Sequence, residues 1–303
     1  MINIIGKRKY FYGVSIFLVS ASIFSLLFWG LRFGIDFKGG SLMEIEFLNQ
    51  RPEIKEIKEA IGNLELGDVF IQPTGERGYF LRLKDLDEQA HQKVLERIKT
   101  LGEIEEKRFD SVGPAIGEEL KRRAYQAILI VLILIVIYIA FAFRKVSRPV
   151  ASWKYGLAAV IALFHDVLIP TGLFSFLGHF YGVEIDLLYV TGLLTILGFS
   201  VHDTIVVFDR LRENLRKGVG KSFEETANIS INQTLTRSIN TSLTVFLTLL
   251  AIFIFGGAST KYFALLLLVG IFFGTYSSIF VASSLLVSNE VWRQKKIAKK
   301  IGR

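Results

Sequence analysis

Two acidic side chains lie inside long apolar stretches of this 303-residue sequence. Asp166 and Asp203 each follow a histidine, in the dipeptides His165-Asp166 and His202-Asp203. An ionisable group inside a lipid bilayer costs about 3 kcal/mol or more unless it is paired or hydrated. The pattern therefore indicates either a proton or ion relay, or a buried polar network that holds helices together.

Asp203 has a potential partner on the next apolar block. We expect its own block to end at Phe208, about 8 Å further along a helix, and Arg237 stands where the next block begins. On neighbouring antiparallel helices the two side chains can reach the same depth. A neighbouring Arg favours an ionised Asp and burial favours a protonated one, which suits a carboxylate that gains and loses a proton. The alternative is that Arg237 only extends to the aqueous boundary.

The whole chain is patterned for a membrane, with 51% apolar residues and a mean hydropathy of +0.44. A helix needs about 20 residues to cross a bilayer. The first of six long apolar blocks has 22 residues, more than a typical signal-peptide core, so we predict a retained helix. The six predicted spans are residues 10–31, 124–143, 155–178, 187–208, 238–257 and 262–288.

The distribution of charge predicts the orientation of the chain. Residues 32–123 hold 16 Lys and Arg against 19 Asp and Glu, whereas the rest holds 20 against 9. That basic excess sits in short segments, including Arg144, Lys145 and Arg148, which is typical of cytoplasmic loops and not of nucleic-acid binding. We therefore expect both termini to be cytoplasmic. Residues 1–31 would hold the first span, 124–288 the other five, and 289–303 a basic cytoplasmic tail.

Residues 32–123 are expected to form an extracytoplasmic α+β domain. Alternation and amphipathic spacing predict strands at 43–47, 69–71, 79–83 and 104–109, with helices beginning at Pro52 and covering 90–101. The order β-α-β-β-α-β favours a ferredoxin-like sandwich. His91, alone on a charged helix, is interpreted as a solvated residue. This segment contains no nucleophile-and-base group, so the sequence does not indicate an enzyme.

The last two blocks carry further patterns. The fifth begins with many hydroxyl and amide side chains, which we expect to face a bundle interior or a hydrated path because lipid tolerates them poorly. Ser222 followed by Glu225 is a capping-box pattern and predicts a short helix before this block. In the sixth block, small residues at four-residue spacing predict a close contact with another helix. These are Gly270, Gly274, Ser278 and Ala282.

Several kinds of chemistry are not indicated. The sequence has no Cys, which excludes disulfides, thiolate metal sites and a Cys nucleophile. It has no phosphate-binding loop or nucleotide fingerprint, and two His-Asp dipeptides on separate helices make a weak metal site. We therefore expect no bound cofactor, and an energy source in the membrane gradient rather than in ATP bound by this chain.

Six short motifs, in order along nearly the whole chain, resemble those of the SecD/SecF family. The first, GIDFKGG at residues 34–40, contains Asp36, Gly39 and Gly40 and follows the first span. The others are VGP with GEEL at 112–120, ALFHD at 162–166, GFSVHDTIVVFDRLREN at 198–214, QTLTRS at 233–238 and GTYSSIF at 274–280.

The resemblance implies a SecF-like, RND-type protein of the bacterial inner membrane. Such a protein pairs with a SecD-like subunit, joins the SecYEG translocon and uses an H⁺ or Na⁺ gradient to assist movement of exported polypeptides. It implies that Asp203 and Arg237 are ion-pathway residues. His202 stands where many relatives have Asn, so it either titrates with Asp203 or only forms hydrogen bonds. Two other classes remain open: a half-size RND-type exporter of small molecules or lipids, and a translocon scaffold that moves no ions.

Overall fold

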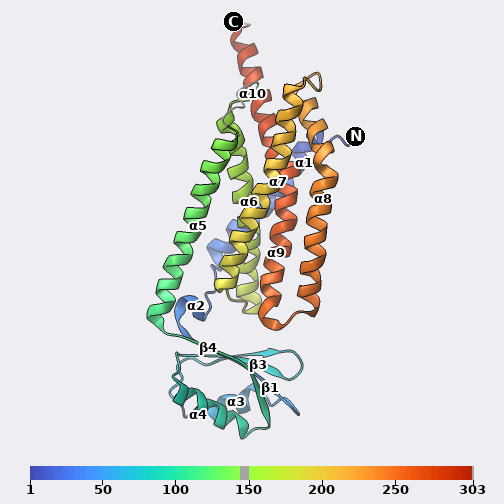
Figure 1. The fold of residues 1–303 in the computed structure, drawn as a ribbon. Helices are drawn as coiled ribbons and strands as arrows, with labels where there is room; N and C mark the ends of the chain where they lie inside the picture. Colours follow the sequence, from blue (N-terminus) through green and yellow to red (C-terminus); the bar gives the residue numbers. More distant parts are fainter. Residues whose placement is uncertain (144–149, 302–303) are drawn as a thin grey trace. The chain divides into compact units, whose positions relative to one another are not determined.

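The computed structural model describes residues 1–143 and 150–301, so Arg144, Lys145 and Arg148 lie outside the described residues. Six helices in these ranges are long and apolar enough to cross a membrane, which agrees in number and order with the six predicted apolar blocks. The chain divides into two compact units (Figure 1). We call them the helical unit (Met1–Arg32, Ile128–Val183 and Leu188–Arg303) and the sheet unit (Phe33–Ala127 and Glu184–Leu187).

The sixth span of the helical unit contains a π-helical turn. Two α-helices flank this turn, and the three segments follow one another without a break in helical backbone angles. A π-helical turn inside a span is uncommon and often marks a functional site. The elements are η1 (Ile5–Lys7), α1 (Arg8–Phe28), α5 (Pro114–Ala142), α6 (Ser152–Tyr181), α7 (Leu187–Arg216), α8 (Phe223–Phe255), α9 (Ala258–Tyr276), η2 (Ser277–Ala282) and α10 (Ser283–Ile301).

Several helices extend beyond their predicted spans, and α5 begins at Pro114, within the segment 32–123 that was predicted to precede it. α7 continues beyond Phe208 to Arg216, because no Gly or Pro interrupts it before Gly218. α8 is one helix from Phe223, so the predicted short helix and the fifth span are continuous. Its N-cap is Ser222, whose Oγ accepts a hydrogen bond from the Glu225 N–H at 3.2 Å. Hydropathy marks where apolar residues end and does not mark where a helix ends.

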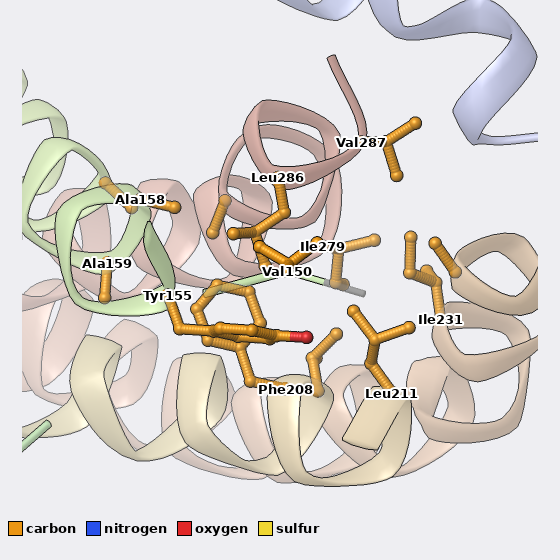
Figure 2. Packing of buried hydrophobic residues seen from close by; sticks show 14 of the residues in the cluster. Val150, Tyr155, Ala158, Ala159, Phe208, Leu211, Ile231, Ile279, Leu286 and Val287 are labelled. Carbon is orange, nitrogen blue, oxygen red and sulfur yellow. The ribbon is translucent and has the colours of Figure 1, made fainter. Parts of the chain in front are cut away.

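The apolar core of the helical unit lies among α6, α7 and the sixth span. Tyr155 is fully buried, its ring is stacked on Phe143 with centroids 5.4 Å apart, and it meets Phe208 edge-on at 5.4 Å. Figure 2 shows aliphatic side chains such as Leu211 and Leu286 around these rings. This cluster fills the space between the spans with tightly packed side chains.

α1 and α6 cross at a point lined by small residues. A Cβ added to Gly172 would lie 2.4 Å from the Cα of Ser22, so the two backbones are in direct contact. Beside this point the Ser25 hydroxyl donates to the Gly172 carbonyl and the Ser175 hydroxyl donates to the Ser25 carbonyl, both at 2.9 Å. Small residues permit such close approach of membrane helices.

The sheet unit carries a four-stranded antiparallel sheet in the order β2-β3-β1-β4. Its four strands and two main helices follow one another in the predicted order, which confirms the predicted pattern. Ile57, Ile61, Val94 and Ile98 of the helices join a core with sheet residues such as Met43. The elements are α2 (Ile35–Lys38), β1 (Gly40–Phe47), α3 (Ile54–Ile61), β2 (Phe70–Thr74), β3 (Gly78–Leu83), α4 (Glu88–Lys99) and β4 (Ile104–Val112).

The interpretation of His91 as a solvated residue is wrong. Its side chain is 5% exposed, its ring is stacked on Phe109 at 3.7 Å, and its Nε2 lies 2.7 Å from a Glu106 oxygen. His91 shares a helix face with Val94 and Ile98, which turn toward the sheet. Glu88, one turn earlier, contacts His91 Nδ1 at 3.4 Å, whereas Lys93, Glu96 and Arg97 are exposed.

The loop between α6 and α7 belongs to the sheet unit. The Gly34 N–H donates to the Ile185 carbonyl at 2.9 Å, and the Leu187 N–H donates to Asp36 Oδ2 at 2.9 Å. Arg82 of β3 forms a salt bridge with Glu184 at 2.7 Å. A loop that connects two spans is therefore an integral part of the sheet unit.

Candidate functional site

Asp203 is a buried carboxylate with one oxygen bound and one open. It lies on α7 and is 7% exposed. Its Oδ1 accepts a hydrogen bond from the hydroxyl of Ser238 on α8 at 2.5 Å. Its Oδ2 is buried and has no hydrogen-bond partner among the described residues. The open oxygen is a position at which a proton can bind without breaking an existing contact.

Arg237 and His202 do not bind Asp203 directly. Ser238 turns toward α7, whereas Arg237, one position earlier on α8, is exposed and makes no hydrogen bond or ion pair with a described residue. His202 is likewise exposed on the other side of α7. Both lie within electrostatic range of the Asp203 carboxylate. The hydroxyl of Ser238 therefore occupies the contact at which the sequence suggested an arginine.

Asp166 is fully buried on α6, and both of its oxygens are occupied. Oδ1 lies 2.8 Å from His165 Nδ1. Oδ2 accepts hydrogen bonds from the hydroxyls of Ser200 on α7, at 2.5 Å, and Ser277 on η2, at 2.6 Å. One carboxylate thus binds side chains from three elements and joins three spans.

The small-residue stripe of the sixth span makes this arrangement possible. An added Cβ at Gly270 would lie 2.2 Å from Ile196 Cδ1, and one at Gly274 would lie 3.2 Å from Ser200 Cβ, so α9 packs tightly on α7. One turn further, Ser278 and Thr204 share a hydrogen bond of 2.8 Å between their hydroxyls. Ala282 is also buried. This close contact brings Ser277 and Ser200 to the same carboxylate.

The polar residues at the start of the fifth span divide between two faces of α8. One face points into the helical unit, where Ser238 meets Asp203 and Ser242 meets Thr275 at 2.5 Å. The other face is exposed in this chain, so the bundle interior accounts for one face only, and for the other face the hydrated path stays a prediction. The exposed polar residues recur at helical spacing: Arg237, Asn240, Thr241, Thr244 and Thr248.

The GIDFKGG segment packs closely against its surroundings because its glycines adopt unusual backbone angles and carry no side chain. Gly39 and Gly40 have φ angles of +77° and +124°, which side-chain-bearing residues rarely adopt. A Cβ on Gly39 would lie 2.7 Å from the Cα of Pro114, and one on Gly117 would lie 2.8 Å from the Gly39 nitrogen. The first two sequence motifs therefore pack against each other in the sheet unit, with Asp36 holding the Leu187 N–H.

The hydroxyl partners of the two carboxylates could not be identified from the sequence alone. Ser200, Ser238 and Ser277 look like ordinary small residues of apolar spans, and only their positions opposite an acid give them a role. Within residues 1–143 and 150–301, no group of three or more His, Asp or Glu side chains could hold a metal ion.

Two family models match the sequence. One, described as protein export membrane protein SecD/SecF, C-terminal, matches residues 91–292, and the other, the SecD/SecF GG motif, matches residues 24–47. The protein translocase subunit SecF of Thermobaculum terrenum is 48% identical over 309 residues, which cover 97% of this chain and 95% of the relative. That of Anaerolinea thermophila is 43% identical over 291 residues, which cover 95% and 94%.

Solved structures of SecDF resemble this chain closely. The crystal structure of SecDF from Thermus thermophilus, described as a translocon-associated membrane protein, matches with a TM-score of 0.80 and 34% identity. The match covers 97% of this chain and 39% of that one. SecDF in its super-membrane-facing form matches with a TM-score of 0.71 and 34% identity over 99% of this chain and 40% of that one. This chain thus spans about two fifths of the SecDF chains and nearly the full length of the SecF relatives.

Proposed function

Because this chain belongs to the SecF group of the SecD/SecF protein-export family, we propose that it uses a transmembrane ion gradient to assist protein export through the SecYEG translocon. Its six apolar helices and its SecF relatives indicate a multi-pass protein of the inner membrane. We propose that both termini face the cytoplasm, since basic residues flank the spans on that side. The sheet unit, with its β-α-β-β-α-β order and β2-β3-β1-β4 sheet, would be a ferredoxin-like extracytoplasmic domain.

Asp203 is the proposed ion-carrying group, with H⁺ as the ion. The observation that supports this role most strongly is its open, buried Oδ2 beside an Oδ1 that Ser238 holds. Ser238 fixes the orientation of the carboxylate, and the open oxygen is left for the proton. Arg237 lies within electrostatic range of Asp203 and favours its ionised form. A change in the distance between α7 and α8 would alter that balance and so drive protonation and release.

Asp166 is proposed to hold the helices together. A carboxylate whose two oxygens are both engaged by neighbouring side chains is fixed in position by those side chains. Its contacts with Ser200 and Ser277 place α7 and the sixth span against α6. The two acids, similar in sequence context, would thus differ in role because both oxygens of Asp166 have partners and only one oxygen of Asp203 has one.

A SecD-like subunit is the proposed partner of the exposed face of α8. Arg237, Asn240, Thr241 and Thr244 lie on this face within a membrane span. Lipid cannot satisfy the hydrogen-bonding groups of such side chains, so a protein surface or a hydrated path is expected to cover them. SecD supplies such a surface next to the ion-carrying carboxylate.

The test is gradient-stimulated export in inverted membrane vesicles that carry Asp203→Asn. We expect the variant to assemble with its partners and to lose the stimulation, because an amide cannot take up and release a proton. Asp68→Asn, which removes an exposed carboxylate of the sheet unit, is the matched control and should export normally. Full gradient stimulation in an assembled Asp203→Asn complex would show that Asp203 is structural and that the chain acts as a scaffold.

A further inference from the structure

A second group of buried polar atoms lies at the basic end of the helical unit. Glu290 of α10 is 1% exposed, and Tyr155 of α6 is fully buried. Glu290 Oε2 and the Tyr155 hydroxyl are both without a hydrogen-bond partner among the described residues. Glu290 acts electrostatically on Tyr155, and Lys154 donates to Asn289 at 2.5 Å, so the two helices meet at these positions. The unpaired Glu290 carboxylate oxygen, an acceptor, thus lies near the unpaired Tyr155 hydroxyl, a donor.

The Glu290 carboxylate is held on one side only. Its Oε1 accepts hydrogen bonds from Arg293, at 2.7 Å, and from Gln294, at 3.2 Å. The Arg293 side chain is 46% exposed, so this side of the carboxylate reaches toward the aqueous boundary. Oε2 points into buried surroundings. Leaving a buried polar atom unpaired costs about 1–3 kcal/mol. Such an atom in a folded protein therefore calls for an explanation, of which a functional role is one.

Tyr155 and Glu290 lie at the same level along the helix axes, and this level is displaced from that of Asp166. Tyr155 precedes Asp166 by 11 residues and Glu290 follows Ser277 by 13, which correspond to about 16 Å and about 20 Å of helix. Since α6 and the sixth span run in opposite directions, both displacements point to the same end. Figure 2 shows the Tyr155 hydroxyl directed into the apolar cluster that separates the two sites.

Two further unpaired hydroxyls lie between the sites. Ser283 and Ser284, at the start of α10, are buried and have no hydrogen-bond partner among the described residues. Ser283 is six residues after Ser277 and seven before Glu290, and a separation of seven places it on the same helix face as Glu290. The sixth span therefore carries polar groups at three successive levels through a cluster that is otherwise apolar.

We infer that Glu290, together with Tyr155, is the proton-release site on the cytoplasmic side, reached from the Asp203 and Asp166 region through Ser283 and Ser284. This inference rests on the proposed function. A proton leaves the Asp203 carboxyl, each hydroxyl or intervening water accepts one proton and passes on another, and Glu290 Oε2 gains an O–H bond. Protonation weakens the ion pair with Arg293. Re-formation of that pair then returns the proton to cytoplasmic water, and Asp203 stays ionised until it takes up the next proton from the other side.

Among the described residues, several basic groups adjoin this site. Lys154 precedes Tyr155 on α6, Arg293 follows Glu290 on its own helix, and Arg212 of α7 follows Leu211 of the surrounding cluster. Nearby cations favour release of a bound proton. These cations would therefore favour release of a proton from Glu290 over its retention there.

The test measures proton flux into proteoliposomes that contain the assembled complex and an entrapped pH-sensitive dye. For Glu290→Gln we expect flux to fall by about a hundredfold, the lower end of what a positioned acid–base group contributes. Tyr155→Phe, which removes only a hydroxyl, should also lower flux. The matched control is Tyr12→Phe, whose hydroxyl already has a partner in Ser288 at 3.0 Å, and it should leave flux unchanged.

The outcomes separate this inference from the proposed function. If Asp203→Asn abolishes flux while Glu290→Gln and Tyr155→Phe behave as wild type, the release site is refuted and the proposed role of Asp203 stands. If Glu290→Gln loses flux while Asp203→Asn keeps it, the release site stands and the proposed role of Asp203 fails. Should Glu290→Gln fail to assemble, Tyr155→Phe decides: lowered flux supports the site, and unchanged flux overturns it.

Discussion

At the scale of single residues, the two buried acids show how hydrogen-bond partners divide similar side chains between roles. Both follow a histidine and both lie inside an apolar span. Asp166 is bonded on each oxygen, whereas Asp203 keeps Oδ2 open. The difference arises from His165, which contacts Oδ1 of its own neighbour Asp166 whereas His202 does not contact Asp203, and from serines on other helices that hold the remaining oxygens.

Substitution of Asp166 should therefore affect stability before it affects transport. Asp166→Leu leaves Ser200, Ser277 and His165 without their common acceptor, and we expect a loss of about 2–4 kcal/mol, since each unpaired buried donor costs about 1–3 kcal/mol. Asp166→Asn keeps one oxygen for the hydroxyls, and His165 can accept through Nδ1 after a change of tautomer, so its loss should be smaller. Thermal unfolding in detergent measures both. Equal, wild-type stability of the two variants would contradict the role of Asp166 in holding the helices.

What the sequence could predict at this scale depended on how unusual a residue is in its surroundings. An acid within an apolar block stands out, so Asp166 and Asp203 could be singled out. A serine in a span does not, so Ser200 and Ser277 could not, and Ser238 could be expected only to face a bundle interior or a hydrated path with the other polar residues of the fifth block. Depth along the helix could bring Arg237 to the level of Asp203 but could not show which side chain of α8 contacts the carboxylate, because one residue along a helix is a rotation of about 100°.

At the scale of helices and strands, close contacts between backbones set the arrangement of spans. The crossing of α1 and α6 rests on Gly172, where an added Cβ would meet a backbone atom of Ser22. Hydropathy could predict the presence of these helices, and strand alternation could predict the sheet. Neither pattern could predict this crossing or η2, because both depend on which faces of the helices pack against each other.

Gly172→Ala should destabilise the protein even though alanine favours helices. The new methyl group would force α1 away from α6, and we expect overpacking to cost about 1–3 kcal/mol. Gly198→Ala on α7 is the matched control, since a Cβ there meets nothing within 4 Å. It should be neutral or gain up to about 1 kcal/mol from helix propensity. Thermal unfolding in detergent compares the two, and a Gly172→Ala variant as stable as the control would refute the contact.

At the scale of the whole molecule, the proposed orientation assigns the sheet unit to the outside and the α7–α8 loop to the cytoplasm. That assignment depends on basic residues in short loops, three of which lie outside the described residues. The fold alone is compatible with either direction of insertion, because a helix bundle is stable whichever way it crosses the membrane. The orientation therefore needs its own measurement.

The lack of cysteine in the sequence makes that measurement direct. We introduce Gln50→Cys in the sheet unit or Lys221→Cys just before α8, both at exposed positions, and add a membrane-impermeant thiol reagent to intact spheroplasts. Gln50→Cys should be labelled at once and Lys221→Cys only after permeabilisation. The reverse pattern would invert the topology, and the cysteine-free parent should remain unlabelled.

The place of the α6–α7 loop within the sheet unit also determines the order in which the protein can be made. The sheet unit is assembled from residues 33–127 and from residues 184–187. A ribosome must therefore synthesise α5 and α6 before the last piece of that unit exists, and the Asp36 contact with the Leu187 N–H can form only after both helices have been inserted. In the proposed orientation, completion of the sheet unit would therefore report that α5 and α6 have crossed the bilayer. During synthesis its edge at Gly34 and Asp36 stays open until then.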